Sequence, residues 1–196
     1  SRLKSDVAEG AALVIGRLAV RRAGSIGLLT FGAGRPRLLP PRASKPGLVA
    51  LERTLREGVA RDGSRDPSGL ENALVRTGKV ANQPGLVIVI SDFRDLGPGW
   101  TRALGALRAR HSVMAIEVRD PREGALPAVG RLALIDPESG ERLEVDTGRR
   151  AIRERFAAIE AEGRAAVARE LRRQRVEHVV LSTEGDWLRE LGRRLQ

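Results

Sequence analysis

The chain contains no cysteine and no tyrosine, and aromatic residues make up only 3% of it. The absence of cysteine excludes disulfides and thiolate metal sites, and it leaves the redox compartment undetermined. The scarcity of aromatic side chains removes the platforms on which many proteins stack unpaired bases. Histidine occurs only at His111 and His178, and neither has metal-ligand spacing around it, so the pattern disfavours a zinc site or a catalytic triad.

Long hydrophobic runs are also absent. No apolar stretch approaches the roughly 20 residues of a membrane span, and the opening residues do not resemble a signal peptide. We therefore expect a soluble, cytoplasmic segment that does not contact a membrane. With 196 residues, 41% of them hydrophobic, the chain is long enough for one domain with its own core, and we expect a single domain over 1–196.

Positive charge is in excess. The formal net charge is +10, and lysine supplies only three of the 35 basic residues. Such an excess of positive charge raises the question of whether the chain binds nucleic acid. However, about half of the excess lies in residues 149–175, where arginine and glutamate alternate as on an ordinary solvated helix face. A basic nucleic-acid-binding module is therefore the third of three hypotheses, and a strong salt dependence of oligonucleotide binding would support it.

Hydrophobic periodicity predicts helices and strands that alternate along most of the chain. Such alternation favours an α/β fold with a mostly parallel, doubly wound, Rossmann-like sheet and helices on both faces. Within a loop and insertion over 120–148, two extended pieces flank the turn residues 137–140 and predict a β-hairpin at 131–146. Strands are expected at 25–31, 35–41, 86–91, 112–118 and 176–183, and helices at 2–22, 46–58, 67–78, 149–174 and around Trp100 and Trp187.

One strand ends in an unusual way. In LVIVISDFRDLGPGW (86–100), five apolar residues lead directly to Ser91 and Asp92. Ligands of parallel sheets gather at the carboxyl ends of the strands, which is where Asp92 lies. An aspartate here also commonly caps the next helix or braces a turn, and the sequence alone gives these interpretations about equal weight.

Ser68 is a candidate companion of Asp92, because hydroxyl and carboxylate oxygens are hard ligands suited to Mg²⁺, Mn²⁺ or Ca²⁺. Ser68 opens a helix that precedes the Asp92 strand in GSRDPSGLENAL (63–74). A structural interpretation competes and is favoured from spacing alone: either Ser68 and Glu71 form a capping box, or Asp66 caps the helix with Pro67 at its first position.

Enzymatic patterns are incomplete. The segment Phe31–Pro36 offers G-x-G without the third glycine of a dinucleotide site, no P-loop occurs, and Ser91 lacks the G-x-S-x-G elbow of a hydrolase. The spacing of Asp92 and Asp95 does not match the D-x-D of phosphoryl-transfer folds. We expect a protein that is not an enzyme.

Taken together, several stretches resemble the von Willebrand factor A-like domain. More closely, they resemble its bacterial branch known as domain of unknown function 58, whose members accompany MoxR-type AAA+ ATPases. The likeness covers nearly the whole chain. It rests on AEGAALVIGRLAVRRAGSIGLLTFG (8–32), SGLENAL (68–74), LVIVISDF (86–93), DPRE (120–123) and LIDPESGERLEVDT (134–147).

The resemblance implies a metal-ion-dependent adhesion site (MIDAS). In A-like domains three loops at the carboxyl edge hold a divalent cation, and an acidic residue of a partner completes its coordination. By position, Asp92 matches the third-loop aspartate and Ser68 stands where the family has threonine, with Ser91 and Asp95 as expected partner contacts. The first-loop D-x-S-x-S does not occur in this sequence.

The same resemblance implies a central strand that this sequence lacks. Its neighbours would then face each other across about two strand spacings, ~10 Å. We expect this strand to precede Ser1, so that the domain is N-terminally incomplete here; alternatively, another segment fills the position and the metal site is lost. The functional hypothesis is an adaptor that grips an acidic partner residue and works with a MoxR-type ATPase in protein maturation or remodelling. The second hypothesis is a metal-independent interaction or structural domain in which Asp92 and Ser68 only cap helices.

Overall fold

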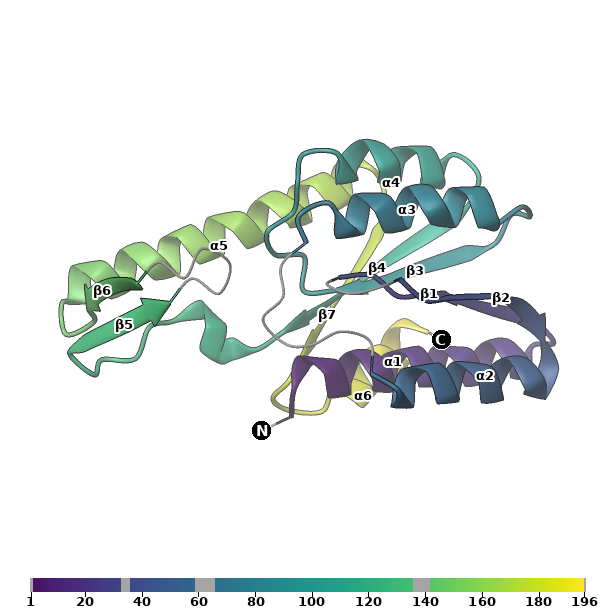
Figure 1. Ribbon diagram of the computed structural model, residues 1–196, viewed down its shortest axis with the longest axis horizontal. Helices are drawn as coiled ribbons and strands as arrows, with labels where there is room; N and C mark the ends of the chain where they lie inside the picture. The colour runs from purple at the N-terminus through teal and green to yellow at the C-terminus, as the bar shows by residue number, and fades with distance from the viewer. Residues whose placement is uncertain (1, 33–35, 59–65, 136–141, 196) are drawn as a thin grey trace.

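The computed structural model describes residues 2–32, 36–58, 66–135 and 142–195 (Figure 1). The helices are α1 Lys4–Arg21, α2 Ser44–Arg56, α3 Gly69–Val80, α4 Trp100–Arg108, the short 3₁₀ helix η1 Pro121–Gly124, α5 Arg150–Arg173 and α6 Trp187–Arg194. The strands are β1 Ser25–Leu29, β2 Leu38–Ala43, β3 Leu86–Ser91, β4 Ser112–Arg119, β5 Arg131–Ile135, β6 Arg142–Asp146 and β7 Glu177–Ser182.

A three-stranded parallel sheet in the order β3-β4-β7 forms the centre of the body. Alternate residues of β4 face opposite sides of this sheet, because side chains alternate along a strand. Val113 and Ala115 pack with residues of α3, α4 and α5. Met114, Ile116 and Val118 pack with residues of α1 and α6. Both faces of β4 are therefore buried, as its nearly continuous apolar sequence predicts.

A second sheet pairs β1 and β2 in antiparallel fashion. Ile26 of β1 packs with Leu51 and Leu55 of α2 in a separate small core. Pro40 and Pro41 lie in β2, which pairs only with β1 among the described residues. Proline is tolerated in such an edge strand, because its outer edge forms no ladder hydrogen bonds that the missing N–H would have to donate.

The prediction of one mostly parallel, doubly wound sheet is confirmed only for β3, β4 and β7. Within the described residues the strands form three separate sheets, and β1 is not hydrogen-bonded to β3. Strand pairing is a contact between distant segments, and periodicity in each segment alone does not specify it. No described strand lies between β1 and β3.

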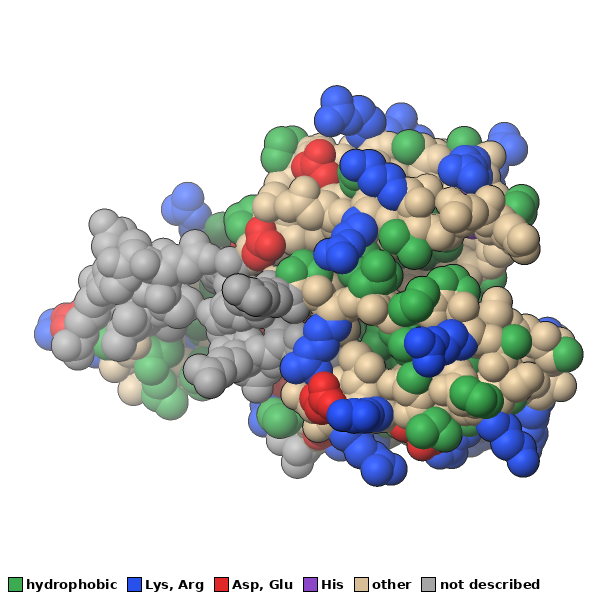
Figure 2. Space-filling view, turned by 45° about the vertical axis from the view of Figure 1, so that its right-hand side comes forward, with side chains coloured by type: hydrophobic (Ala, Val, Ile, Leu, Met, Phe, Trp, Pro, Cys, Tyr) green, Lys and Arg blue, Asp and Glu red, His purple; other side chains and the backbone are tan. Residues whose placement is uncertain are grey.

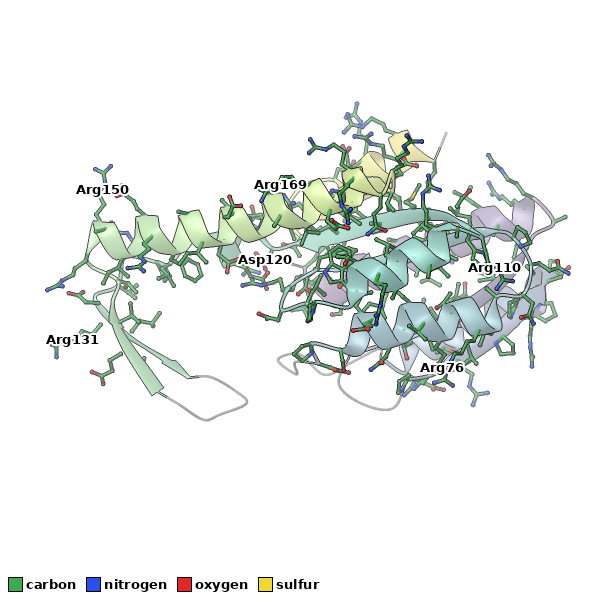
Figure 3. All side chains as sticks on the ribbon, turned by 90° about the horizontal axis from the view of Figure 1, so that it is seen from above. Arg76, Arg110, Asp120, Arg131, Arg150 and Arg169 are labelled. Atoms are coloured by element: carbon green, nitrogen blue, oxygen red, sulfur yellow. The ribbon has the colours of Figure 1, made fainter. Side chains whose placement is uncertain are left out.

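The hairpin predicted at 131–146 is present, with β5 and β6 paired from Arg131 opposite Asp146 to Ile135 opposite Arg142. Its expected turn at 137–140 lies outside the described residues. This hairpin and the first half of α5 extend away from the body (Figure 1), and Figure 3 shows Arg131 and Arg150 at the far end of this arm. Among the described side chains of α5, only Leu171 is buried, close to the end of the helix in the body.

Candidate functional site

Asp92 follows β3 directly and begins the loop that leads to α4. Asp92 Oδ1 accepts a hydrogen bond from the Arg94 backbone N–H (3.3 Å), and Ser91 Oγ accepts one from the Phe93 N–H (3.1 Å). Phe93 and Asp95 have φ values of 52° and 50°, in the left-handed region that side chains rarely adopt. The two side-chain contacts brace this strained turn, so the turn role expected for Asp92 is present. Asp92 does not cap α4, whose N-cap residue is Gly99.

Lys4 is the closest cation to Asp92. Its Nζ lies 2.7 Å from Asp92 Oδ2 and 2.7 Å from Glu123 Oε1, so one ammonium joins two carboxylates from separate elements. Partial burial lowers the pKa of Lys4, but the hydrogen bonds to Asp92 and Glu123 outweigh it and raise the pKa above its usual 10.5. The Lys4 side chain is 29% exposed and that of Asp92 35%, so the pair stays accessible from solvent.

Arg94 extends this ion-pair network toward the arm. It contacts Glu123 Oε2 (3.1 Å) through Nη1 and Glu160 Oε1 of α5 (2.9 Å) through Nη2. Glu123 thus accepts from both Lys4 and Arg94. We call Lys4, Asp92, Arg94, Glu123 and Glu160 the edge network, because it follows the carboxyl edge of the parallel sheet.

Sequence reasoning missed Lys4 and Glu123. One indication was available for Lys4: a cation in the first turn of a helix opposes the helix dipole, so its presence there calls for an acidic partner. Glu123 carried no comparable signal. Its contact with Lys4 depends on how η1 is folded against the start of α1.

Ser68 lies on a loop next to the Asp92 loop, since the Gly97 N–H donates to the Pro67 carbonyl at 2.9 Å. The contacts recorded for its hydroxyl are local: Ser68 Oγ donates to Asp66 Oδ1 (2.8 Å) and accepts from Asn72 Nδ2 (3.2 Å). The prediction of a capping box between Ser68 and Glu71 is wrong, because the Ser68 side chain makes no cap hydrogen bond. Asp66 Oδ1 accepts from the Ser68 N–H (3.1 Å), but the helix begins at Gly69 with Ser68 as its N-cap residue, so Pro67 is not at the first helical position that the alternative predicted.

Asp95 and Asp92 line a cleft of about 490 Å³ between the sheet edge and α5. Arg94, Arg119 and Glu160 also line it, so its walls carry both signs of charge. Ser91, the other expected partner contact, is engaged in the turn described above. Polar and charged groups of this kind can bind a complementary protein surface.

A buried polar cluster lies at the inner end of this cleft, on the face of the sheet that α5 covers. Glu117 of β4 contacts His178 Nε2 of β7 at 2.8 Å and forms a two-point ion pair with Arg119, one contact of which is 2.8 Å long. Burial raises the pKa of Glu117, but the bonds to His178 and Arg119 outweigh it and hold the pKa below 4.5. Sequence reasoning missed this cluster too, although a glutamate inside an apolar strand predicts a buried partner.

The described residues do not by themselves form a complete divalent-cation site. They contain no group of three or more His, Cys, Asp or Glu side chains placed to hold a metal ion. Asp92 and Glu123 supply two carboxylates, but the Lys4 ammonium already pairs with both, and the recorded bonds of the Ser68 hydroxyl stay within its own helix start. The first-loop ligands that the resemblance implies do not occur in the sequence.

The basic side chains on the visible face of the body do not gather into one patch. Figure 2 shows Lys and Arg side chains scattered over the visible face of the body. On α5, arginines pair with glutamates of the same helix, as in Arg150 with Glu154 (2.6 Å) and Arg173 with Glu170 (2.8 Å). This arrangement agrees with a solvated helix face.

Comparison with solved structures identifies the class of fold to which the chain belongs. The chain superimposes on the crystal structure of the conserved hypothetical protein BatB from Bacteroides thetaiotaomicron with a TM-score of 0.54 and 14% identity, over 96% of this chain and 86% of that one. An aerotolerance-related membrane protein from Bacteroides fragilis, solved with multiple mutations to serines, gives a TM-score of 0.53 and 12% identity over the same shares. These similarities establish a shared α/β fold.

The particular family follows from sequence. The chain belongs to the family described as "Protein of unknown function DUF58", which matches residues 1–166. The uncharacterized protein MAV169 of Mycobacterium avium is 38% identical over 147 residues, which cover 72% of this chain and 85% of that protein. The uncharacterized protein Rv1480 of Mycobacterium tuberculosis is 34% identical over 97% of this chain, and the match spans 59% of its own length. An uncharacterized protein of Mycobacterium bovis, Mb1516, gives the same values.

Within the described ranges, no helix is both long enough and apolar enough to cross a membrane.

Proposed function

We propose that this chain is a non-enzymatic protein-interaction domain that binds its partner at the carboxyl edge of the parallel sheet, around Asp92. The observation that carries the proposal is the edge network. Five charged side chains from α1, the β3 loop, η1 and α5 converge on one edge, and most remain partly exposed. Ligands of parallel sheets characteristically bind at this edge.

The finer form of the proposal is an adhesion-type site. Asp92, with Ser68 on the adjacent loop, contributes oxygen ligands to a divalent cation, and ligands from outside the described residues complete the set. When bound, the cation supplies an incompletely neutralised positive charge that attracts an acidic residue of the partner. The role of this chain's own residues is to orient Asp92 through the turn contact with Arg94 and to hold Ser91 and Asp95 at the contact surface.

A metal-independent form is the second candidate, and one observation favours it. The Lys4 ammonium lies 2.7 Å from both Asp92 and Glu123, where a cation bound by these carboxylates would compete with it. In this form the edge network itself is the complementary surface, and the partner pairs with its partly exposed charges.

The partner we propose is a MoxR-type AAA+ ATPase, with the pair acting in maturation or remodelling of other proteins. Family resemblance supports this partner, and the fold shared with BatB is compatible with it. An adaptor of this kind needs an exposed polar surface on a stable body, which the edge network provides.

Calorimetric titration of the full-length protein with MgCl₂ or MnCl₂ tests the two forms. In the adhesion form, Asp92→Ala lowers cation affinity on the order of tenfold to a hundredfold, since even outer-sphere partners of metal ligands are worth that much. Lys4→Met raises the affinity in this form, because it removes the competing ammonium. Glu162→Ala is the matched control, because Glu162 is an exposed carboxylate on α5 that pairs only with Arg169 among the recorded ion pairs.

Absence of cation binding in the wild type and in Lys4→Met rejects the adhesion form and leaves the metal-independent one. Retention of the purified ATPase on the immobilised protein then tests the interaction itself. Charge reversal in Asp92→Lys or Glu123→Lys weakens retention under both forms, whereas Glu162→Lys does not. Equal retention by all variants contradicts the proposed surface.

A further inference from the structure

The projecting part of α5 carries an apolar stripe that the body only partly covers. Four residues at steps of four, three and four share one face of the helix: Ile152, Phe156, Ile159 and Gly163. Ile159 is 62% exposed, and a carbon added at Gly163 would meet nothing within 4 Å. Figure 1 shows this part of the helix extending from the body beside the hairpin, and Figure 3 shows it from above. The stripe is therefore open to a partner.

The stripe has the spacing of a coiled-coil seam, in which apolar residues alternate at steps of three and four. Helices in proteins owe most of their stability to the packing of such an apolar face, because helical propensity alone is marginal in water. Among the described side chains of α5, however, only Leu171 is buried, at the other end of the helix. A second helix along the stripe supplies the packing that a single copy lacks.

The charges beside the stripe complement an antiparallel helix of the same sequence. Arg155 immediately precedes Phe156, and Glu162 immediately precedes Gly163, so both charges flank the seam on the same side. Equivalent flanking positions face each other across an antiparallel pair, and their charges set partner choice and orientation. Arg155 is exposed, and it forms no recorded ion pair in the part of the chain that the structure describes. Glu162 is 71% exposed and contacts only Arg169 among the recorded ion pairs (2.7 Å), through one of its two oxygens.

We infer that two copies of this chain pair through the stripes of their α5 helices, antiparallel about a two-fold axis between residues 157 and 158. Ile152 of one copy then lies opposite Gly163 of the second, where the absent side chain leaves room for it. Phe156 lies opposite Ile159. The same surface serves on both copies, so the contact closes at a dimer.

The antiparallel register also fits the body. It confines the contact to residues 150–165, so the second helix stops short of the buried end of α5 at Leu171. Ile159 and Gly163 line the outer part of the cleft of about 490 Å³ described above, which receives Ile152 of the second copy. A parallel pair would instead bring both bodies to the same end and leave Gly163 facing Gly163 across an unfilled seam.

Sedimentation equilibrium of the protein, without divalent cations or ATPase, tests the inference. The wild type sediments as a dimer that dissociates on dilution. Ile159→Glu raises the dissociation constant on the order of a hundredfold, because each copy then brings a carboxylate into the apolar seam. Val49→Glu is the matched control, since Val49 of α2 is 63% exposed outside the stripe, and it leaves the constant unchanged. Both residues are exposed in one copy, so thermal melting of the monomer stays the same.

A wild type that is monomeric at all concentrations overturns the inference, as does an equal effect of Ile159→Glu and Val49→Glu. Charge exchange gives a second readout. Arg155→Glu or Glu162→Arg alone weakens the dimer on the order of tenfold, because two like-charge contacts replace two attractive ones. The double variant Arg155→Glu/Glu162→Arg restores the wild-type affinity. A double variant as weak as either single one contradicts the pairing. These measurements involve neither cation nor ATPase, so failure here is distinguishable from failure of the proposed function.

The absence of native cysteine allows a direct test of the register. A mixture of the Ile152→Cys and Gly163→Cys variants forms a disulfide that joins one copy of each. Neither variant cross-links with itself, because equivalent sites lie about 16 Å apart along the antiparallel helices, whereas a disulfide needs Cα atoms within about 7 Å. Cross-linking of Ile152→Cys with itself identifies a parallel pair and overturns the inference, and so does a mixture that forms no disulfide.

Discussion

Replacement of Glu117 by glutamine is expected to destabilise the fold more than any other single neutralisation of a carboxylate in the described residues. The Glu117 side chain is only 3% exposed and pairs with two cationic or polar partners, His178 and Arg119. Glutamine keeps the size of the side chain but removes its charge. Arg119 and His178 then face a neutral amide inside the protein.

The expected cost follows from the burial of the cluster. Removal of one partner from a buried ion pair typically costs about 3–5 kcal/mol. Arg119 is 31% exposed and can turn its charge toward solvent, and the amide of glutamine retains one hydrogen bond, so we expect about 2–3 kcal/mol. For a chain of this length, each kcal/mol lowers the melting temperature by about 2–4 °C. The expected decrease is therefore about 4–12 °C at pH 7.

The pH dependence provides the sharper assay. Because folding holds the pKa of Glu117 below 4.5, the ionised group stabilises the fold fully above the pKa of the unfolded chain. That contribution is lost as pH falls through the lower, folded-state pKa. The difference in melting temperature between wild type and Glu117→Gln is thus constant near pH 5 to 6 and shrinks toward pH 3. A difference below 1 °C at pH 6, or one that does not shrink in acid, refutes the reasoning.

The remaining predictions concern packing. Gly10→Ala places a methyl group 2.7 Å from Trp187 Cη2, so the indole must shift, and the free energy of unfolding falls by about 1–2 kcal/mol. Gly163→Ala, where the added carbon meets nothing within 4 Å, instead raises it by about 0.5–1 kcal/mol, and urea titration of both variants checks the opposite signs. Leu104→Ala, at a side chain 2% exposed in the core beneath α4, costs about 3 kcal/mol by the same titration, and a loss below 1 kcal/mol contradicts the burial described.

The local elements could be predicted from the sequence, because local patterns determine them. The residues Val113–Val118, apolar except for Glu117, and the alternation around residues 131–146 each identify a strand without reference to the rest of the chain. Whether β1 is hydrogen-bonded to the parallel sheet could not be predicted from such local patterns. It depends on whether another strand lies between β1 and β3, and neither segment's own residues specify its neighbour.

The candidate site was predictable to a similar extent. Asp92 stands at a strand end, and both its position and its turn contact follow from local sequence. Its pairing with Lys4 does not, since the two residues are 88 positions apart and meet only when α1 folds beneath the sheet. Ser68 shows the opposite case: spacing alone indicated a helix start, and its recorded hydrogen bonds belong to one.

The edge network joins the projecting arm to the turn around Asp92. α5 is one unbroken helix of 24 residues, about 36 Å long, and among its described side chains only Leu171, near its end in the body, is buried. Glu160 lies between Leu171 and the free end and is held by Arg94 of the β3 loop. Because the Arg94 N–H also donates to Asp92, a displacement of α5 at Glu160 is expected to act on the turn around Asp92.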